Sequence, residues 1–157
     1  MKDLKTEIKI KECQMDELSA ADRKIVEAAI QSTAHSYAPH SQFHVGACVL
    51  LADDTVIPGC NQENAAFPAG ICAERSAIFA AGAQRPDQAV KALAIAARDK
   101  NGRLTKEPVT PCGTCRQVMV ETEKRFSHPI HIILYGQERI FVMDGIRNLM
   151  PLSFTEF

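Results

Sequence analysis

The chain has 157 residues, of which 46% are hydrophobic and 24% are charged. This length and composition predict one globular domain, residues 1–157, and argue against intrinsic disorder. The 18 lysines and arginines nearly balance the 19 aspartates and glutamates, so the basic excess of a dedicated nucleic-acid binder is missing. The longest apolar run, residues 45–52, is far shorter than the roughly 20 residues of a membrane-spanning helix, and we expect no membrane partner.

The N-terminal third of the chain predicts a short strand followed by a helix. The first ten residues lack the apolar stretch of a secretory signal, so we expect a cytoplasmic location. Alternating charged and apolar side chains predict a strand or arm over residues 6–11. A first helix is expected to begin after Ser19, a plausible N-cap, and to end before Pro39.

The rest of the chain alternates between helical and extended patterns. It predicts, in order, a hairpin of strands 45–52 and 55–61, a helix over 72–81 closed by Gly82, a strand over 91–97, a helix over 112–126, and strands over 131–135 and 139–142. Helices that alternate with strands after a hairpin indicate a mixed sheet covered on both faces. We therefore predict a three-layer α/β/α fold with a mixed central sheet.

Candidate chemistry is concentrated at the starts of two predicted helices. One opens with Cys72, which is followed by Ala73 and Glu74, and the other carries Cys112 and Cys115 on one face. At a helix start the Cα–Cβ bonds lean toward the N-terminus, where unpaired N–H groups and the helix dipole favour thiolates. Two such helix starts that face each other would bring three sulfurs around one point.

Three thiolates supply three corners of a tetrahedron, and the spacing offers no obvious fourth protein ligand. An open fourth position is typical of catalytic zinc, which activates water for hydrolysis, whereas structural zinc is normally closed by four protein ligands. Glu74 would lie close to the metal without binding it and could accept a proton. Arg75 and the two helix dipoles could offset the negative charge of three thiolates around a divalent ion.

The spacing Cys-x-Glu followed by Pro-Cys-x-x-Cys resembles the zinc-deaminase signature. The surrounding sequence resembles the small homotetrameric cytidine deaminases over four ordered blocks, residues 38–47, 59–65, 72–75 and 111–117, and in its ending, residues 149–154. The resemblance covers most of the chain. It implies a zinc-dependent hydrolase that converts cytidine and deoxycytidine to uridine and deoxyuridine with release of ammonia, a reaction of pyrimidine salvage.

The resemblance also assigns roles to individual residues. It implies one zinc ion per chain on Cys72, Cys112 and Cys115, with Glu74 as the proton shuttle, and a homotetrameric assembly.

For the nucleoside substrate, it implies that Asn61 and Glu63 bind the ribose hydroxyls, Phe43 packs against the pyrimidine ring, and the N–H of Ala73 holds the base carbonyl. These residue types suit the task, because an amide and a carboxylate can recognise a diol and an aromatic face suits a flat base.

Two other readings remain open. His40 and Phe67 stand where the family commonly has tyrosine, which leaves room for a related deaminase of a modified pyrimidine or aminonucleoside. The Cys-x-x-Cys pair alone is also consistent with a redox pair, or with a structural zinc site closed by Cys60 or a histidine. Either non-catalytic protein would have no use for Glu74.

Overall fold

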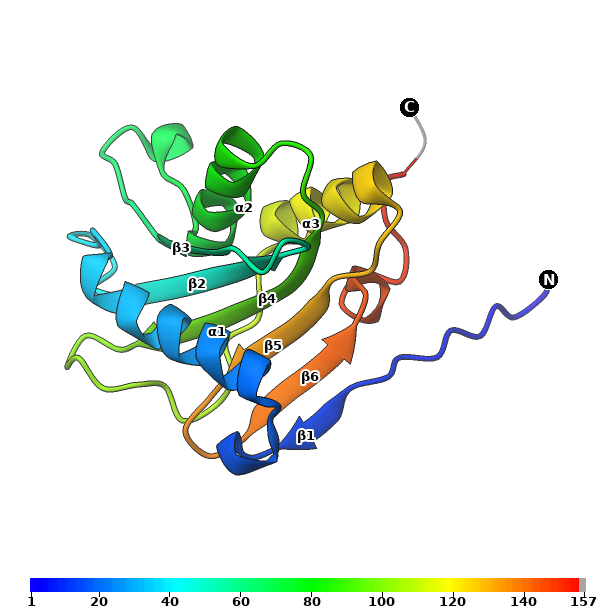
Figure 1. Cartoon of the computed structure of the whole chain (residues 1–157), viewed down its shortest axis with the longest axis horizontal. Helices are drawn as coiled ribbons and strands as arrows, with labels where there is room; N and C mark the ends of the chain where they lie inside the picture. Colours follow the sequence, from blue (N-terminus) through cyan, green and yellow to red (C-terminus); the bar gives the residue numbers. More distant parts are fainter. Residues whose placement is uncertain (156–157) are drawn as a thin grey trace.

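The structure, a computed structural model, describes residues 1–155 and consists of a six-stranded sheet between two layers of helices (Figure 1). Residues 156 and 157 of the predicted domain lie outside the described residues. The main elements are β1 (Lys11–Cys13), α1 (Ala20–Ser32), β2 (His44–Leu51), β3 (Val56–Cys60), α2 (Ala73–Gln84), β4 (Val90–Arg98), α3 (Gly113–Phe126), β5 (His131–Tyr135) and β6 (Ile140–Asp144). Within residues 1–155, no helix is both long and apolar enough to cross a bilayer.

The strands are arranged in the order β1-β6-β5-β4-β2-β3. Only β4 and β5 pair in parallel, and α3 connects them across one face of the sheet; the other pairs are antiparallel. Helix α1 covers one face, and α2 and α3 cover the other (Figure 1). The predicted three-layer α/β/α fold with a mixed sheet is confirmed.

Each face of the sheet has its own hydrophobic core, because side chains alternate along a strand. In β4, Leu93 and Ile95 pack toward α2 and α3, whereas three alanines between and beside them face α1. These small side chains let α1 pack close to the sheet. At Gly46 of β2 the approach is so tight that an added Cβ would lie 2.0 Å from the carbonyl oxygen of Ala29.

Three predicted boundaries were wrong. Residues 6–10 form no strand; pairing with β6 begins at Lys11, and Lys9 donates its N–H to the side chain of Asn148 instead. Helix α1 ends at Ser32 and continues only as a 3₁₀ turn, η2 (Thr33–His35), well before Pro39. Gly82 does not close α2, which runs on to Gln84, because its backbone stays helical.

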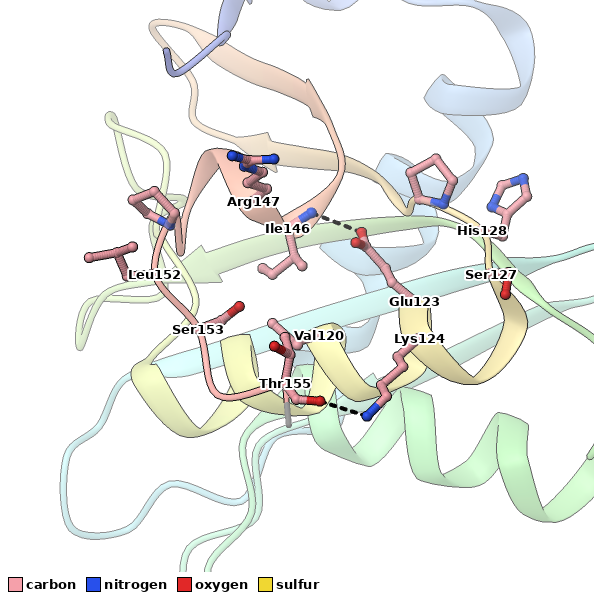
Figure 2. Close-up of a pocket in the computed structure, with 12 residues that line it drawn as sticks. Val120, Glu123, Lys124, Ser127, His128, Ile146, Arg147, Leu152, Ser153 and Thr155 are labelled. Atoms are coloured by element: carbon pink, nitrogen blue, oxygen red, sulfur yellow. Dashed lines mark hydrogen bonds between the residues drawn. The ribbon is translucent and has the colours of Figure 1, made fainter. Parts of the chain in front are cut away.

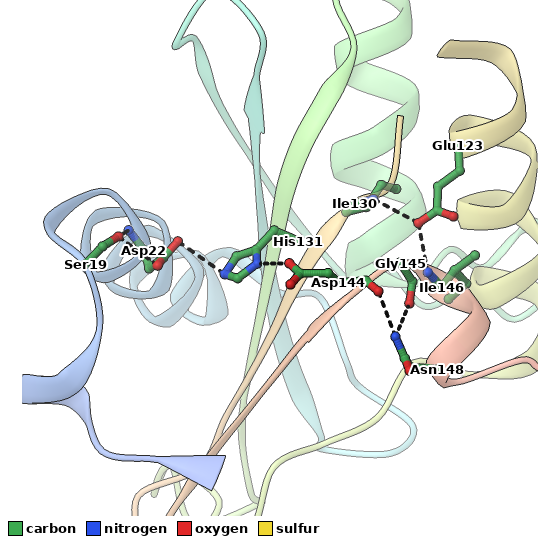
Figure 3. A network of polar contacts seen from close by, with 9 residues as sticks. All are labelled: Ser19, Asp22, Glu123, Ile130, His131, Asp144, Gly145, Ile146 and Asn148. Carbon is green, nitrogen blue, oxygen red and sulfur yellow. Dashed lines mark hydrogen bonds and ion pairs between the residues drawn. The ribbon is translucent and has the colours of Figure 1, made fainter. Parts of the chain in front are cut away.

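Polar contacts connect the helices on both faces to strands β5 and β6 (Figure 3). His131 of β5 lies between Asp144 of β6, at 2.5 Å, and Asp22 of α1, at 3.6 Å. On the other face, Glu123 of α3 accepts two backbone N–H groups, one before β5 and one after β6, each at 2.8 Å. These contacts join α1 and α3 to the β5–β6 hairpin.

Candidate active site

The two helices that carry the clustered cysteines begin at the same edge of the sheet. Strands β3 and β4 are both antiparallel to β2, so they run in the same direction and end at one edge. The segments that follow them, residues 61–72 and 99–112, therefore start close together and lead into α2 and α3. Strand β2 begins at this edge, which adds Phe43 and His44 to the same region.

The three predicted metal ligands are brought together. Cys72 and Cys112 are the N-cap residues of α2 and α3, and Cys115 lies in the first turn of α3. The Sγ atoms of Cys72 and Cys112 are 3.8 Å apart, those of Cys112 and Cys115 are 3.5 Å apart, and all three lie within 4.8 Å of one another. A tetrahedral ion about 2.3 Å from each sulfur requires separations of about 3.8 Å, so the cluster fits zinc.

A fourth protein ligand is missing from this cluster in the described part of the chain. Cys60, the cysteine that could have closed a structural site, instead contacts the carbonyl oxygen of His35 at 3.3 Å and the side-chain nitrogen of Gln62 at 3.2 Å. It lines a different cavity from the clustered cysteines. Three ligands with an open fourth position are typical of catalytic zinc.

Hydrogen bonds and charge stabilise the thiolate of Cys72. Hydrogen bonds from Cys115 and from Arg75, whose Nη2 lies 3.7 Å from the Cys72 Sγ, lower the pKa of Cys72 to about 5. The pKa of Cys115 is raised, because its thiol proton is held by Cys72 and the site is buried. Arg75 thus contacts the sulfur of Cys72.

Glu74 is buried next to these sulfurs. Only 5% of its surface is exposed, yet it lines the cavity that opens onto Cys72 and Cys112. Burial, together with the nearby Cys72 charge, raises the pKa of the Glu74 carboxyl. A carboxyl group with a raised pKa exchanges protons more readily near neutral pH, which suits a proton shuttle.

A glycine in β3 sets how closely α2 packs on the sheet. A Cβ added at Gly59 would lie 2.4 Å from the backbone nitrogen of Ala77 and 2.7 Å from the carbonyl oxygen of Ala73. No real Cβ makes such contacts with backbone, so a side chain here would push the start of α2 away. Because that start carries Cys72 and Glu74, Gly59 helps to determine where both groups lie.

The cavity beside the cysteines has a volume of about 520 Å³, within the usual range for small-molecule sites. Its walls come from the start of β2, the segment after β3, the 3₁₀ turn η3 (Phe67–Ala69) and the starts of α2 and α3. The structure places eight of the nine predicted site residues on its walls: Phe43, Asn61, Glu63, Cys72, Ala73, Glu74, Arg75 and Cys112. The ninth, Cys115, is fully buried behind them.

Two polar groups of the cavity wall are the carboxylate of Glu63 and the N–H of Ala73. One oxygen of Glu63 accepts the N–H of His40 at 2.7 Å and that of Ser41 at 3.2 Å, and its hydrogen bonds with Ser41 and His40 lower the pKa of its carboxyl. Glu63 is therefore an ionised acceptor. Ala73 is the first residue of α2, so helix geometry leaves its N–H without an intrahelical partner.

Ten residues of the cavity wall were not predicted as site residues, among them His40, Phe67, Val109 and Thr110. The rings of His40 and Phe67 meet edge to face, with centroids 6.2 Å apart, and form part of the rim. Val109 and Thr110 come from the long connection after β4, which carries no recognisable motif. Their one sequence signal is their place directly before the Pro-Cys pair that starts α3.

A larger hollow, of about 1250 Å³, lies elsewhere, at the C-terminal end of α3 (Figure 2). The C-terminal segment curves over the helix there, and Lys124 donates to the carbonyl oxygen of Thr155 at 2.6 Å. Among the described residues that line this hollow, the single carboxylate is Glu123, which is already bonded to backbone N–H groups. Size alone therefore does not identify the functional site; the smaller cavity holds the thiols and the buried acid.

Comparison with known proteins agrees with this geometry. Residues 19–127 match the family model of the cytidine and deoxycytidylate deaminase zinc-binding region. The chain is 46% identical over 98 residues to a cytidine deaminase of Halalkalibacterium halodurans, covering 62% of this chain and 68% of the relative. It is 36% identical over 105 residues to that of Mycobacterium tuberculosis, covering 65% and 74%.

Solved structures give the same result. The cytidine deaminase of Burkholderia pseudomallei superimposes with a TM-score of 0.70 at 36% identity, covering 83% of this chain and 97% of that one. The Mycobacterium tuberculosis enzyme gives a TM-score of 0.66 at 28% identity, covering 88% and 100%. The zinc-binding family model and the three-thiol cluster together support one zinc ion per chain. This chain belongs to the cytidine and deoxycytidylate deaminase family of zinc-binding hydrolases.

Proposed function

We propose that this protein hydrolyses cytidine and deoxycytidine to uridine and deoxyuridine and releases ammonia. The observation that carries the proposal is the buried Glu74 carboxyl beside a cluster of three thiols that leaves a tetrahedral position open. The relatives named cytidine deaminase support the same reaction.

In this proposal Cys72, Cys112 and Cys115 hold the zinc ion. When bound, zinc supplies the activation of water for attack on C4 of the pyrimidine. Glu74 accepts a proton on its carboxylate and delivers it to N3 of the ring. It then accepts a second proton, from the hydroxyl group now on C4, and passes it to the 4-amino group; the C4–N bond breaks, ammonia leaves and the C4–O bond becomes the carbonyl of uridine. The raised pKa of Glu74 supports both halves of this cycle, since the group must gain and lose a proton in each turnover.

The wall residues that are not metal ligands would bind the nucleoside. Phe43 offers an aromatic face to the ring, and the free N–H of Ala73 can donate to the base carbonyl. Asn61 and Glu63 would bind sugar hydroxyls, and the ionised state of Glu63 suits an acceptor for a hydroxyl proton.

Charge favours a free nucleoside over a nucleotide. Among the described residues that line the cavity, no lysine is present, and the one arginine, Arg75, is turned toward Cys72. Glu63 adds a negative charge at the end of the cavity that would bind the sugar, and this charge would repel a phosphate. Deaminase activity on deoxycytidylate, included in the family description, is therefore not part of the proposal.

The aromatic rim made by His40 and Phe67 supports a second candidate, a related deaminase of a modified pyrimidine or aminonucleoside. We further propose a homotetramer that acts in the cytoplasm in pyrimidine salvage, on the basis of the sequence resemblance. Sedimentation of the purified protein tests the assembly, and a monomer would remove the tetramer from the proposal.

The decisive experiment is an ultraviolet absorbance assay of purified, zinc-loaded protein with cytidine and with deoxycytidine. Replacement of the 4-amino group by a carbonyl changes the spectrum, and we expect this change with both substrates. Zinc-loaded protein that leaves both spectra unchanged would contradict the proposal, and a panel of modified cytidines would then test the second candidate.

A further inference from the structure

The carboxamide of Asn61 is largely occupied by bonds within the protein. Its Oδ1 accepts the backbone N–H of Val45 at 2.8 Å and the hydroxyl of Ser36 at 2.6 Å, while its Nδ2 donates to the carbonyl oxygen of Phe43 at 3.0 Å. Because an N–H can only donate and a carbonyl can only accept, these two backbone groups fix which end of the amide is oxygen. One N–H of Asn61 is left for the cavity.

The direction of the bonds around Ser36 follows from proton counting. A serine hydroxyl has one proton, and the oxygen of Asn61 requires it. The remaining contact of the Ser36 oxygen, with Nδ1 of His44 at 3.2 Å, must therefore be one in which Ser36 accepts and His44 carries the proton on Nδ1. The three residues form a directed chain from His44 through Ser36 to Asn61.

This chain joins three separate segments at the edge of the sheet. Ser36 follows η2, His44 begins β2 and Asn61 follows β3; all three side chains are partly buried. Neither Ser36 nor His44 is among the residues that line the cavity, whereas Asn61 lines it. An effect of the Ser36 side chain on a bound molecule is therefore indirect, and its hydrogen bond to Asn61 provides the route.

We infer that Ser36, supported by His44, is a positioning residue that makes Asn61 a pure hydrogen-bond donor toward the sugar. With both acceptor sites of its oxygen filled, Asn61 can offer only an N–H, and the neighbouring Glu63 can offer only a carboxylate oxygen. The pair then selects a sugar that accepts one hydrogen bond and donates another. This inference rests on the proposed nucleoside substrate.

The test is Ser36→Ala, assayed with cytidine, 2′-deoxycytidine and 3′-deoxycytidine. Loss of one hydrogen bond that orients a binding group should raise KM for cytidine by about 3- to 10-fold while kcat stays within about twofold. The penalty should shrink to near unity for the deoxynucleoside that lacks the hydroxyl read by Asn61. Ser36→Thr, which keeps a hydroxyl, should restore the KM.

Ser32→Ala is the matched control. It removes a hydroxyl from a buried serine at the end of α1, which donates to the carbonyl oxygen of Ala28 at 2.8 Å and does not touch Asn61. We expect its KM to remain that of the unmodified protein. An equal penalty of Ser36→Ala on all three nucleosides, a loss confined to kcat, or the same KM change in Ser32→Ala would overturn the inference.

A measurement on the free protein separates this inference from the proposed function. Nitrogen-15 NMR of the imidazole should show His44 protonated on Nδ1, and Ser36→Ala should change that signal. A neutral His44 protonated on Nε2 instead would overturn the inference whatever the substrate. Absence of cytidine turnover in the unmodified protein would contradict the proposed function, while the NMR result would still decide whether the chain of bonds exists.

Discussion

A buried cysteine and a partly buried cysteine, on opposite faces of the sheet, behave in opposite ways. Cys48 of β2 lies in the core beneath α1, where burial raises the pKa of its thiol to about 12. Cys72 lies on the other face, at the start of α2, where hydrogen bonds from Cys115 and Arg75 lower its pKa to about 5. Burial alone makes a thiol inert, whereas a helix start with hydrogen-bond donors makes it a ligand.

The same contrast extends to the two faces as a whole. The α1 face is closed by small residues such as Ala94 and Ala96, so it serves packing. The α2 and α3 face carries every predicted metal ligand and the buried acid Glu74 at one edge. Substitutions on the two faces should therefore separate effects on stability from effects on chemistry.

The largest effect is expected from Glu74→Gln. The amide cannot accept a proton, so turnover of cytidine should fall by about 10²- to 10⁴-fold. The amide has nearly the same shape, so the zinc content and the melting temperature should change little. Absorbance assays combined with metal analysis check this, and activity within tenfold of the unmodified protein would rule out Glu74 as the proton shuttle.

Cysteine substitutions test the comparison directly. Cys115→Ser removes a ligand and should weaken zinc binding by more than about 100-fold, because the thiolate is replaced by a poor ligand. Cys48→Ala should keep about one zinc ion per chain and lose only stability, by about 1 kcal/mol, from a small cavity. Metal analysis after dialysis against a weak chelator distinguishes the two. Equal zinc loss in both variants would contradict the assignment of the ligands.

A pair of glycine substitutions compares how the two faces tolerate crowding. Gly46→Ala pushes against α1 and Gly59→Ala against α2, and each should cost about 1–3 kcal/mol of unfolding free energy. Only Gly59→Ala should also lower kcat/KM and zinc affinity, because only α2 carries Cys72 and Glu74. Denaturant unfolding and activity below the transition check this. A selective loss of activity in Gly46→Ala would show that α1 also controls the site.

The smallest effect concerns pH. Glu74 must be ionised to accept a proton, and burial raises its pKa above the ordinary value of 4.5. As pH falls through this raised pKa, kcat/KM should decline by up to tenfold per pH unit, beginning at a higher pH than for an exposed glutamate. A pH–rate profile measures it, and a constant kcat/KM down to pH 4.5 would contradict the raised pKa.

Local signals predicted the parts of the fold that depend on neighbouring residues. The N-cap at Ser19 is confirmed, because its hydroxyl oxygen accepts a hydrogen bond from the N–H of Asp22, and the hairpin of β2 and β3 is confirmed as well. The wrong boundaries depend on distant partners. Residues 6–10 alternate as a strand would, but their pairing depends on where β6 and the Asn148 turn lie.

The candidate site divides in the same way. The cysteines and Glu74 stand in two short motifs, so their proximity could be predicted from two facing helix starts. The bond between Ser36 and Asn61 joins residues 25 apart in sequence, and neither side chain has a pattern that indicates the other. The rim contact between His40 and Phe67 likewise depends on how two loops fold toward each other.

The division of the metal ligands between two helices has a consequence for how activity responds to metal supply. Cys72 and Glu74 move together with α2, while Cys112 and Cys115 move together with α3. An ion bound by both helices would therefore set the distance between the two helix starts, and with it the position of Glu74 relative to the cysteines. A partly loaded preparation should then be a mixture of fully competent and inactive molecules, with constant turnover per bound ion.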